Sequence, residues 1–438
     1  MHLLKGLVVA GLLLPCVART QPADLPQPTT LEQEVSLPAR IDALDVQGLW
    51  RTERGVVERE LPWRVGAVVS AEQCQEGLAK LWNMGLFSRV SSDLVRRGGQ
   101  TVAVLHVEER WTLNPLISFA VLVQRNAKPG EQSSWWSLGA EDTNVLGQYL
   151  DVAAAYEQFN QFSGGKAWLH DPRWLGRRLD ALVQWEYLVR PRVGFADRRM
   201  LLRSELSGLL DGDRVKIGAR LDLMRDHFFD AGDTPPMLPP DGKTALLDLG
   251  LRMGRVDVVR LRQVGQSLEV RSGVGLSALS DAPGQVHSQA WLQGLGYWAP
   301  GERWNLAARV QGGHQSANTP AHLQYFLGGL YEIRGVRDSY LRADRFGLAN
   351  LEARYTAADW TWLAILPTAF VDMVVARDAE RGWTGLVSAG GGVRLLVPRF
   401  VRTGLRIDLA APMAGMPCTS AGLMGTCVGM SLGVYQFF

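Results

Sequence analysis

The sequence predicts an all-β transmembrane barrel of about sixteen antiparallel strands, preceded by a small α+β domain. From Leu113 onward, apolar and polar residues alternate with a period of two, which is typical of strands with two unlike faces. The alternating segments run to about ten residues or more between turn residues, the length that a tilted membrane strand needs. Only one stretch is continuously apolar, and it lies at the extreme N-terminus. Any membrane crossing after that stretch must therefore use strands.

The charge balance narrows the range of partners. The 438 residues include 46 Lys and Arg against 44 Asp and Glu, a formal net charge of +2. Proteins that bind nucleic acid usually carry a clear basic excess, so no nucleic-acid partner is expected. Neither a cofactor nor a metal ion is expected, because no cysteine has a histidine near it in the sequence and no catalytic serine motif is present.

Residues 1–18 have the features of a signal peptide. Lys5 supplies the positive start, Gly6–Leu14 is an apolar core too short to span a bilayer comfortably, and cleavage is expected near Ala18. An uncleaved anchor is the competing interpretation. Residues 19–39 are rich in Pro and Gln and are expected to form a flexible linker.

Residues 40–110 are expected to form the small α+β domain in the order β-α-α-β-β. A strand at Ile41–Val46 precedes a short helix that Thr52 can cap and Pro62 stops. A capping box at Ser70–Gln73 begins a second, amphipathic helix. Two further strands, joined at a Gly-Gly turn, complete the domain.

The text of this segment resembles a POTRA domain, the periplasmic polypeptide-transport-associated module. The matching strings are IDALDVQGLWRTERGVVERELPWRVGAVVS and LAKLWNMGLFSRVSSDLVRRGGQTVAVLHVEER. They share the family's strand and Gly, its Arg-Thr, its Arg-Glu-Leu helix end and its Gly-Leu-Phe before a strand. Any other small α+β domain is the alternative, because β-α-α-β-β is a common order.

Residues 112–438 are expected to form the barrel, with apolar side chains facing lipid and charged ones facing a wet lumen. A soluble β-sandwich would also alternate, but the strand length and the even strand count favour a membrane barrel. The alternation is clearest in segments 179–190, 214–223, 268–274 and 304–311.

The strand count also predicts which end each connection occupies. If the N-terminus lies in the periplasm, odd-numbered strands end outside, so segments 226–242, 376–384 and 414–426 are expected to be external loops. Short periplasmic turns are expected at 143–147 and 212–214.

The barrel region resembles the BamA/TamA superfamily of POTRA-bearing barrels, also called bacterial surface antigens. The sharpest match is YFLGGLYEIRGVRDSYLRADRFGLANLEARY; TAFVDMVVA, GGGVRLLVPRFVRTGLRIDLAAP and the aromatic terminus LGVYQFF also fit. This chain departs from the pattern in two ways. Val336 follows Arg-Gly where an aromatic residue is usual, a difference that bears on the packing of the loop tip. The resemblance covers one POTRA domain where many relatives have several, a difference that bears on the substrate and partners.

The resemblance implies a lock between a loop and the barrel wall. The long segment Ala317–Phe346, between the eleventh and twelfth strands, would fold back into the lumen, and Arg334 beside Gly335 would pair with Asp372. The strand parity agrees, because Phe370 and Asp372 share one face. The alternative is a solvated loop charge and an ordinary lumen residue.

Two more residues can extend this lock. Glu352 and Arg354 are expected to face the lumen beside Asn350. An ordinary polar interior is an equally good interpretation of these side chains.

The cysteines point to one disulfide at most. Cys16 leaves with the signal peptide, and Cys74 lies on the apolar stripe of a predicted helix. Cys418 and Cys427 lie nine residues apart in a Gly/Met/Ser-rich segment, a spacing that suits a loop-closing disulfide in an oxidising compartment.

The function expected from these features is assembly of outer-membrane proteins or translocation of a polypeptide, without enzymatic chemistry. The expected partners are unfolded, β-rich polypeptides that add a strand to an exposed edge of the POTRA domain, outer-membrane lipid and periplasmic accessory proteins. A passive porin-type channel is the alternative, but it leaves the small domain unexplained. A rim hydrolase would have to use Asp226, His227 and His314, which no nucleophile motif supports.

Overall fold

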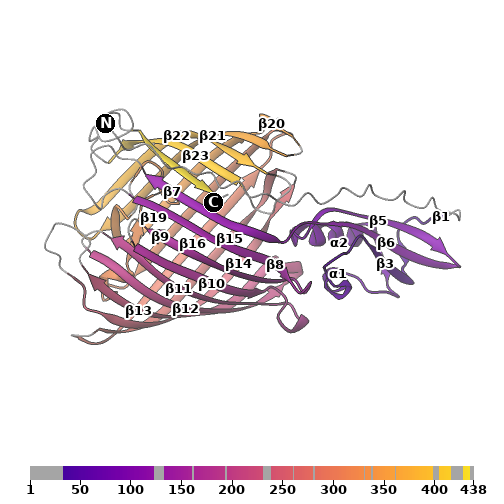
Figure 1. Ribbon diagram of the computed structural model, residues 1–438, viewed down its shortest axis with the longest axis horizontal. Helices are drawn as coiled ribbons and strands as arrows, with labels where there is room; N and C mark the ends of the chain where they lie inside the picture. The colour runs from indigo at the N-terminus through magenta and orange to yellow at the C-terminus, as the bar shows by residue number, and fades with distance from the viewer. Residues whose placement is uncertain are drawn as a thin grey trace, which may run out of the picture.

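A computed structural model gives the structure of the protein. It describes residues 33–122, 133–159, 162–192, 195–229, 238–259, 261–279, 282–329, 331–336, 339–360, 362–397, 404–415 and 428–434. A small domain projects from one end of a large β-barrel (Figure 1). The expected signal peptide and the proposed Cys418–Cys427 disulfide lie outside the described residues.

The small domain is a sheet in the order β1-β5-β6-β3 with two helices packed against it. Strands β5 and β6 form an antiparallel hairpin, and β3 runs parallel to β6. The expected order β-α-α-β-β is found in β3, α1, α2, β5 and β6, and the short strands β1, β2 and β4 are additions that the sequence did not predict. The elements are β1 Gln33–Glu34, β2 Ala39–Arg40, β3 Ala43–Gln47, α1 Arg54–Glu60, β4 Val68–Val69, α2 Ala71–Asn83, β5 Phe87–Arg97 and β6 Gln100–Glu109.

The two helices begin for different reasons. The capping box of α2 is confirmed, because Ser70 accepts from the backbone of Gln73 and the Gln73 side chain accepts from the backbone of Ser70. Thr52 as the cap of α1 is wrong: Glu53 occupies the cap position, and Thr52 instead accepts a hydrogen bond from Asn144 of the barrel. No helix in the described part of the chain is long and apolar enough to cross a membrane.

The last residues of the expected linker are ordered. Gln33 and Glu34 pair with the end of β5, and Ala39 and Arg40 pair with β4. The Pro-rich composition did not predict these strands, because backbone pairing at a sheet edge needs no particular side chains.

Sixteen long strands in the described residues form the wall of a closed barrel, as expected. Each strand pairs antiparallel with the next, and β24 closes the ring against β7. Two short strands, β18 and β20, pair at its ends without interrupting it. The elements are β7 Leu113–Leu122, β8 Ser133–Val145, β9 Leu150–Phe159, β10 Phe162–Asp171, η1 Trp174–Gly176, β11 Leu179–Arg192, β12 Phe195–Leu210, η2 Asp211–Asp213, β13 Val215–Phe229, β14 Gly242–Val259, β15 Arg262–Leu279, β16 Ala282–Trp298, β17 Trp304–Gln315, η3 Ala321–Leu323, β18 Tyr325–Leu327, β19 Leu341–Tyr355, β20 Ala358–Asp359, β21 Ala364–Asp378, β22 Gly382–Leu396, β23 Gly404–Ala414 and β24 Gly429–Val434.

The two faces of the wall differ as the alternation predicts. Val183, Ile217 and Val274 are exposed on the outside, whereas Asp222 and Asp248 are almost completely buried inside. The alternating apolar face therefore points outward, and the charged face lines the lumen.

The connections lie at the expected ends of the barrel. The turns expected at 143–147 and 212–214 are found at 146–149 and 211–214 on the side of the small domain, and β13 ends and β14 begins at the far end (Figure 1). That loop is shorter than expected, because β13 continues to Phe229 before it. β13 is thus longer than the turn residues in the sequence alone suggest.

The small domain is tied to the turns of the barrel by polar contacts. Arg51 donates to Thr112 at 2.7 Å and pairs with Asp142 near the ends of β7 and β8. The backbone of Glu53 donates to the carbonyl of Gly147 at 2.9 Å. These contacts place the first helix directly beside the first turn of the barrel.

A second tie involves a side chain of the turn between β10 and β11. Arg173 donates to both carboxylate oxygens of Glu60, the last residue of α1, at 2.6 Å each, and to Asp213 of the next turn. Burial lowers the pKa of Arg173, but the Glu60 and Asp213 carboxylates outweigh burial and raise it. The guanidinium therefore joins the small domain to two neighbouring turns.

Candidate functional site in the barrel lumen

The candidate site is built on the long connection between β17 and β19, residues 316–340. It contains η3, β18 and a tight turn in which the backbone of Gly329 donates to the carbonyl of Val336 at 3.0 Å. The sequence placed the end of this segment at Phe346, but β19 already begins at Leu341. The alternating residues after Leu341 pair with β17 and β21, so they belong to the wall.

Arg334, at the tip of this turn, reaches Asp372 on β21. Its Nε donates to Oδ2 at 2.7 Å, its Nη2 donates to Oδ1 at 2.6 Å, and its backbone N–H donates to Oδ2 at 3.0 Å. Both side chains are almost completely buried. The structure thus brings together the two residues that the resemblance pairs, in a bidentate geometry that only arginine can make.

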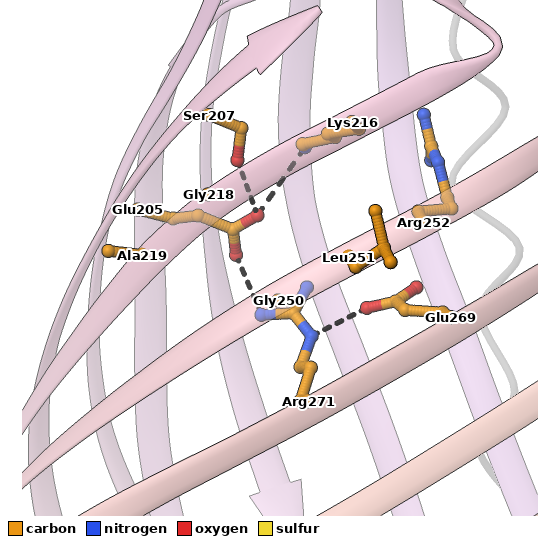
Figure 2. Close-up of a pocket in the computed structure, with 10 residues that line it drawn as sticks. All are labelled: Glu205, Ser207, Lys216, Gly218, Ala219, Gly250, Leu251, Arg252, Glu269 and Arg271. Atoms are coloured by element: carbon orange, nitrogen blue, oxygen red, sulfur yellow. Dashed lines mark hydrogen bonds and ion pairs between the residues drawn. The ribbon is translucent and has the colours of Figure 1, made fainter.

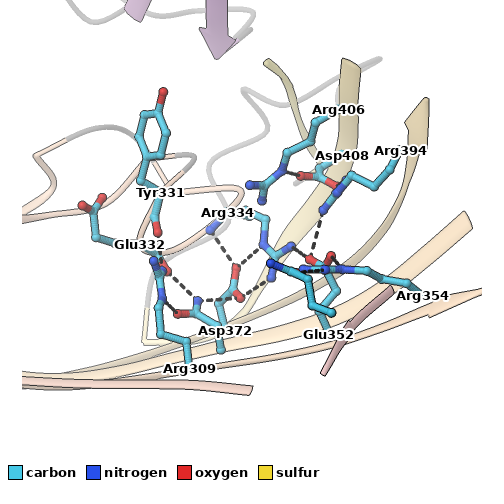
Figure 3. A network of polar contacts seen from close by, with 12 residues as sticks. Arg309, Tyr331, Glu332, Arg334, Glu352, Arg354, Asp372, Arg394, Arg406 and Asp408 are labelled. Carbon is cyan, nitrogen blue, oxygen red and sulfur yellow. Dashed lines mark hydrogen bonds and ion pairs between the residues drawn. The ribbon is translucent and has the colours of Figure 1, made fainter. Parts of the chain in front are cut away.

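The same guanidinium is held from two other sides. Its Nη1 donates to Glu352 on β19 (Figure 3). The carbon at its centre lies 3.5 Å from the centroid of the Phe370 ring. Phe370 and Asp372 project from the same face of β21, so the strand supplies both a stacking surface and a carboxylate. All the residues named for the lock from the sequence therefore meet around Arg334.

Glu352 links the lock to neighbouring strands. It accepts from Arg354 at 2.7 Å and from Arg394 on β22 at 3.0 Å. Arg394 also donates to Asp408 on β23 at 2.6 Å, and Arg406 donates to the same carboxylate. Buried carboxylates that each serve two or more arginines keep these charges compensated inside the lumen.

The backbone of the loop is held from the other flank. Asn350 donates to Asp372 and to the carbonyl of Glu332, both at 2.8 Å. Arg309 on β17 donates to Asn350 and to the carbonyl of Tyr331. The loop tip is thus bonded through its main chain as well as through Arg334.

The loop tip packs closely on the wall. Gly335 has a φ of +80°, and a Cβ there would lie 2.9 Å from the Cβ of Ala410. Glycine is needed at this position both for the backbone conformation and for the close approach. Ile333 and Val336 are buried in an apolar cluster with residues of β19, β21 and β22. Val336 therefore fills the position where an aromatic residue is usual.

The beginning of the loop has a second anchor on the opposite wall. Gln315 donates to the carbonyl of Leu323 at 2.8 Å, and Arg199 on β12 donates to the carbonyl of His322 at 3.3 Å. The Leu323 side chain packs against an apolar cluster of β12, β13 and β14, and His322 packs on Phe228 with a ring distance of 4.8 Å. The loop consequently reaches from β12–β14 to β19–β23 across the lumen.

Replacing Gln315 with alanine is expected to loosen the second anchor alone. The partly buried Leu323 carbonyl loses its donor, at a cost of about 1–3 kcal/mol. Hydrogen exchange in residues 316–324 should become roughly tenfold faster, while residues 331–336 stay protected by Arg334. Gln311→Ala is the matched control, because Gln311 lies on the same strand and donates to Gln293 of the wall. Equal exchange in both variants would show that Gln315 does not anchor the loop.

The remaining lumen wall carries charge pairs of a different kind. Glu205 on β12 lies 3.4 Å from Lys216 and 3.3 Å from Arg271, and Arg271 lies 2.5 Å from Glu269 (Figure 2). The first pair joins the neighbouring strands β12 and β13, the second reaches from β12 to β15, and the third lies within β15; none of them includes the loop.

The residues considered for hydrolysis do not form a site. Asp226 faces the lumen and accepts from Arg199, whereas His227 lies 2.6 Å from Asp241 in the following loop. Neighbouring strand residues point to opposite faces, so Asp226 and His227 cannot act on one substrate. His314 is exposed on the outward-facing side of β17, opposite to Gln315. The described residues contain no cluster of His, Cys, Asp or Glu suited to a metal.

Sequence reasoning missed four arginine and aspartate contributors to the network. Arg309, Arg394, Arg406 and Asp408 all occupy lumen-facing positions of their strands. Parity could have found them, since Arg394, Arg406 and Asp408 lie in the string GGGVRLLVPRFVRTGLRIDLAAP with the spacing of inward positions.

Comparisons with known proteins place this arrangement in a known fold. A scan against protein-family models finds no match to this chain, and no curated protein matches it in sequence. The crystal structure of BamA from Haemophilus ducreyi lacking POTRA domains 1–3 aligns with 90% of this chain and 83% of that chain, at a TM-score of 0.55 and 14% identity. CdiB from Escherichia coli aligns with 91% of this chain and 76% of that chain, at a TM-score of 0.63 and 13% identity. CdiB from Acinetobacter baumannii aligns with 90% of this chain and 73% of that chain, at a TM-score of 0.59 and 12% identity.

At these identities the similarity concerns the fold. The chain is a BamA- and CdiB-like barrel, which confirms the resemblance drawn from the sequence.

Proposed function

We propose that this chain is a bacterial outer-membrane barrel that handles polypeptides, either inserting barrel proteins into the membrane or moving a polypeptide across it. The observation that carries the proposal is the loop 316–340, which crosses the lumen and is held there by Arg334. Unlocking the loop would provide the space that a polypeptide needs.

The small domain gives the proposal its second support. Residues 40–110 would act as a POTRA domain in the periplasm, with a sheet edge that binds extended clients through backbone hydrogen bonds. The ties of Arg51 and Arg173 to the turns would hold that edge at a fixed place beside the barrel. The proposed mature chain begins after the signal peptide at residues 1–18, and outer-membrane lipid and periplasmic accessory proteins complete the set of partners.

Depletion of the protein in its own bacterium tests this function. Insertion predicts that barrel proteins disappear from the outer membrane and accumulate as unfolded chains, whereas translocation predicts that particular polypeptides disappear from the medium. Quantitative proteomics of both fractions measures either loss, and re-expression of the wild-type chain is the control. Unchanged proteomes combined with slower uptake of small solutes would identify a passive porin instead.

A further inference from the structure

Three basic side chains lie on the outward face of the barrel wall, at the end far from the small domain (Figure 1). Arg198 is near the start of β12, Arg225 near the end of β13 and Lys243 near the start of β14, and all three are exposed. The next residues along two of these strands, Asp226 and Thr244, are almost completely buried and face the lumen. Because neighbouring strand residues point to opposite faces, the three cations point outward. We call these three residues the basic patch.

The pairing of the strands brings the three cations close together. Arg225 lies directly opposite Lys243 in the β13–β14 ladder and directly opposite Met200 in the β12–β13 ladder. Arg198 precedes Met200 by two positions on β12, so it lies diagonal to Arg225. Side chains directly opposite on one face have Cβ atoms about 4.5–5.5 Å apart, and diagonal ones lie within about 7–8 Å. One small anionic group can therefore contact all three side chains.

No carboxylate separates Arg225 from Lys243. In the part of the chain that the structure describes, neither side chain makes a hydrogen bond or an ion pair. Like charges that lie directly opposite in a ladder destabilise it. Near the other end of β14, by contrast, Arg255 is paired with Asp257 at 2.7 Å. An anionic ligand would remove the repulsion between Arg225 and Lys243.

The third cation is ordered without using its hydrogen-bond donors. The Arg198 guanidinium lies 5.2 Å from the centroid of the Phe229 ring, and no described residue accepts from its N–H groups. Asp241, a carboxylate whose charge acts on Arg225, lies 2.6 Å from His227. That carboxylate is therefore shared with a partner outside the basic patch.

The height of the basic patch along the wall matches the edge of the apolar band of a transmembrane barrel. On β14 the outward positions from Met253 to Ala245 are apolar, and Lys243 is the next outward residue. From Met253 to Lys243 the strand spans about 33 Å, at about 3.3 Å per residue. A strand tilt of about 40° reduces this to about 25 Å, the usual height of the band. The patch would thus lie level with lipid headgroups.

The wall next to the patch suits the tail of a lipid. Leu202 and Leu223 lie directly opposite each other, one outward position closer to the small domain than Met200 and Arg225, and both are exposed. Leu221 and Leu247 continue this apolar surface across β13 and β14. Acyl chains could therefore pack on these side chains while the headgroup of the same lipid contacts the basic patch.

We propose that the basic patch binds a phosphate group of lipopolysaccharide, the phosphorylated glycolipid of the outer leaflet. The inference rests on the orientation in the proposed function, in which the small domain is periplasmic and the patch lies at the outer surface. A phosphate monoester carries a charge of about −1.5 to −2 at neutral pH, which matches three cations better than the single charge of a phospholipid phosphodiester. Arginine can contact two phosphate oxygens at once, and lysine adds a point charge.

Binding of bis-phosphorylated lipid A to the detergent-solubilised full chain, measured by native mass spectrometry over a lipid titration, tests this inference. Arg225→Gln with Lys243→Gln should weaken binding about 100-fold, at about tenfold for each lost cation. Arg177→Gln with Arg178→Gln is the matched control: it removes the same charge from an exposed turn at the other end of the barrel, and binding should stay at the wild-type level.

Two further lipids distinguish the phosphate monoester from other features of a lipid. Lipid A without phosphate groups has the same acyl chains, and it should bind the wild-type chain as weakly as bis-phosphorylated lipid A binds the Arg225/Lys243 double variant. Phosphatidylglycerol, which carries one phosphodiester, should bind the wild-type chain and the double variant alike.

Three outcomes would overturn the inference. The first is equal binding of bis-phosphorylated lipid A to the wild type and the double variant. The second is equal binding of the two forms of lipid A to the wild-type chain. The third is a loss of phosphatidylglycerol binding as large as the loss of lipid A binding, because the patch would then serve any anionic lipid.

The inference stays testable if the double variant does not fold. Gel migration before and after boiling shows whether its barrel is closed. The comparison of the two forms of lipid A uses the wild-type chain alone, so it changes the ligand and not the protein. The proposed function fails by a different measurement, namely unchanged outer-membrane and secreted proteomes after depletion.

Discussion

Replacing either Arg334 or Asp372 with alanine is expected to release the loop 316–340 from β19–β23 and abolish most of the client-handling activity. Removing one partner of a buried ion pair typically costs about 3–5 kcal/mol, because the other charge stays buried without compensation. Here Arg334 also serves Glu352, so its loss removes two ion pairs together. The barrel should stay folded, because the hydrogen bonds between its strands do not involve these side chains.

Three measurements check this expectation. Hydrogen exchange of residues 331–336 should accelerate, channel conductance in planar bilayers should rise, and assembly or secretion in a depleted strain should fall. Arg203→Ala is a matched control, since Arg203 makes a bidentate pair with Asp222 at 2.8 and 2.9 Å within the wall. If the Arg334 and Arg203 variants behave alike in exchange and conductance, the loop lock does not exist.

Exchanging the two charged residues is expected to recover only part of the lost client-handling activity, and less than it would if Arg334 and Asp372 contacted only each other. In Arg334→Asp with Asp372→Arg, the new aspartate would face Glu352, which now accepts from Arg334. The double variant would also lose the hydrogen bond that the backbone N–H of residue 334 donates to Asp372, because an arginine side chain cannot accept it. Arg334→Lys should likewise retain little of the client-handling activity, because an ammonium cannot make the bidentate contact with Asp372.

Alternation along the strands made the barrel predictable from the sequence. A wall with lipid on one side and water on the other forces a period of two, and sixteen segments follow from counting. The boundaries were less predictable. Residues 341–346 are expected in the loop from the sequence, whereas pairing with β17, β18 and β21 makes them strand.

The lock was partly predictable for a related reason. Asp372 and Phe370 share a face by parity, but parity gives no information about which loop residue approaches them. The resemblance supplied Arg334. Arg394, Arg406 and Asp408 were missed because an inward charge on a strand is ordinary in a lumen, and only the closed ring brings β22 and β23 beside Glu352.

Contacts between the two domains could not be predicted at all. Thr52 looked like a helix cap, since the local sequence suits that role, but its hydroxyl bonds to Asn144, 92 residues away. Glu60 and Arg173 are likewise 113 residues apart. Such contacts depend on how the domains meet, which local patterns do not record.

Deleting residues 40–110 is expected to leave a folded barrel without biological activity. The barrel keeps its strand pairing, Arg173 keeps Asp213, and Asn144 still accepts from the backbone of Tyr149. The groups that lose partners lie on turns, where water replaces the lost contacts, so the loss of stability should be modest. Clients would nevertheless lose their docking edge.

Glu60→Gln separates the presence of the small domain from its fixed position. This variant keeps the domain and its shape but weakens the bidentate contact with Arg173, so activity should fall between those of the wild type and the deletion. Faster gel migration before boiling than after checks that each barrel is closed, and client assembly or secretion in a depleted strain reports activity. Full activity of the deletion variant would remove the small domain from the mechanism and favour a passive channel. Wild-type activity of Glu60→Gln, with an inactive deletion, would instead mean that docking requires the domain but not its rigid attachment.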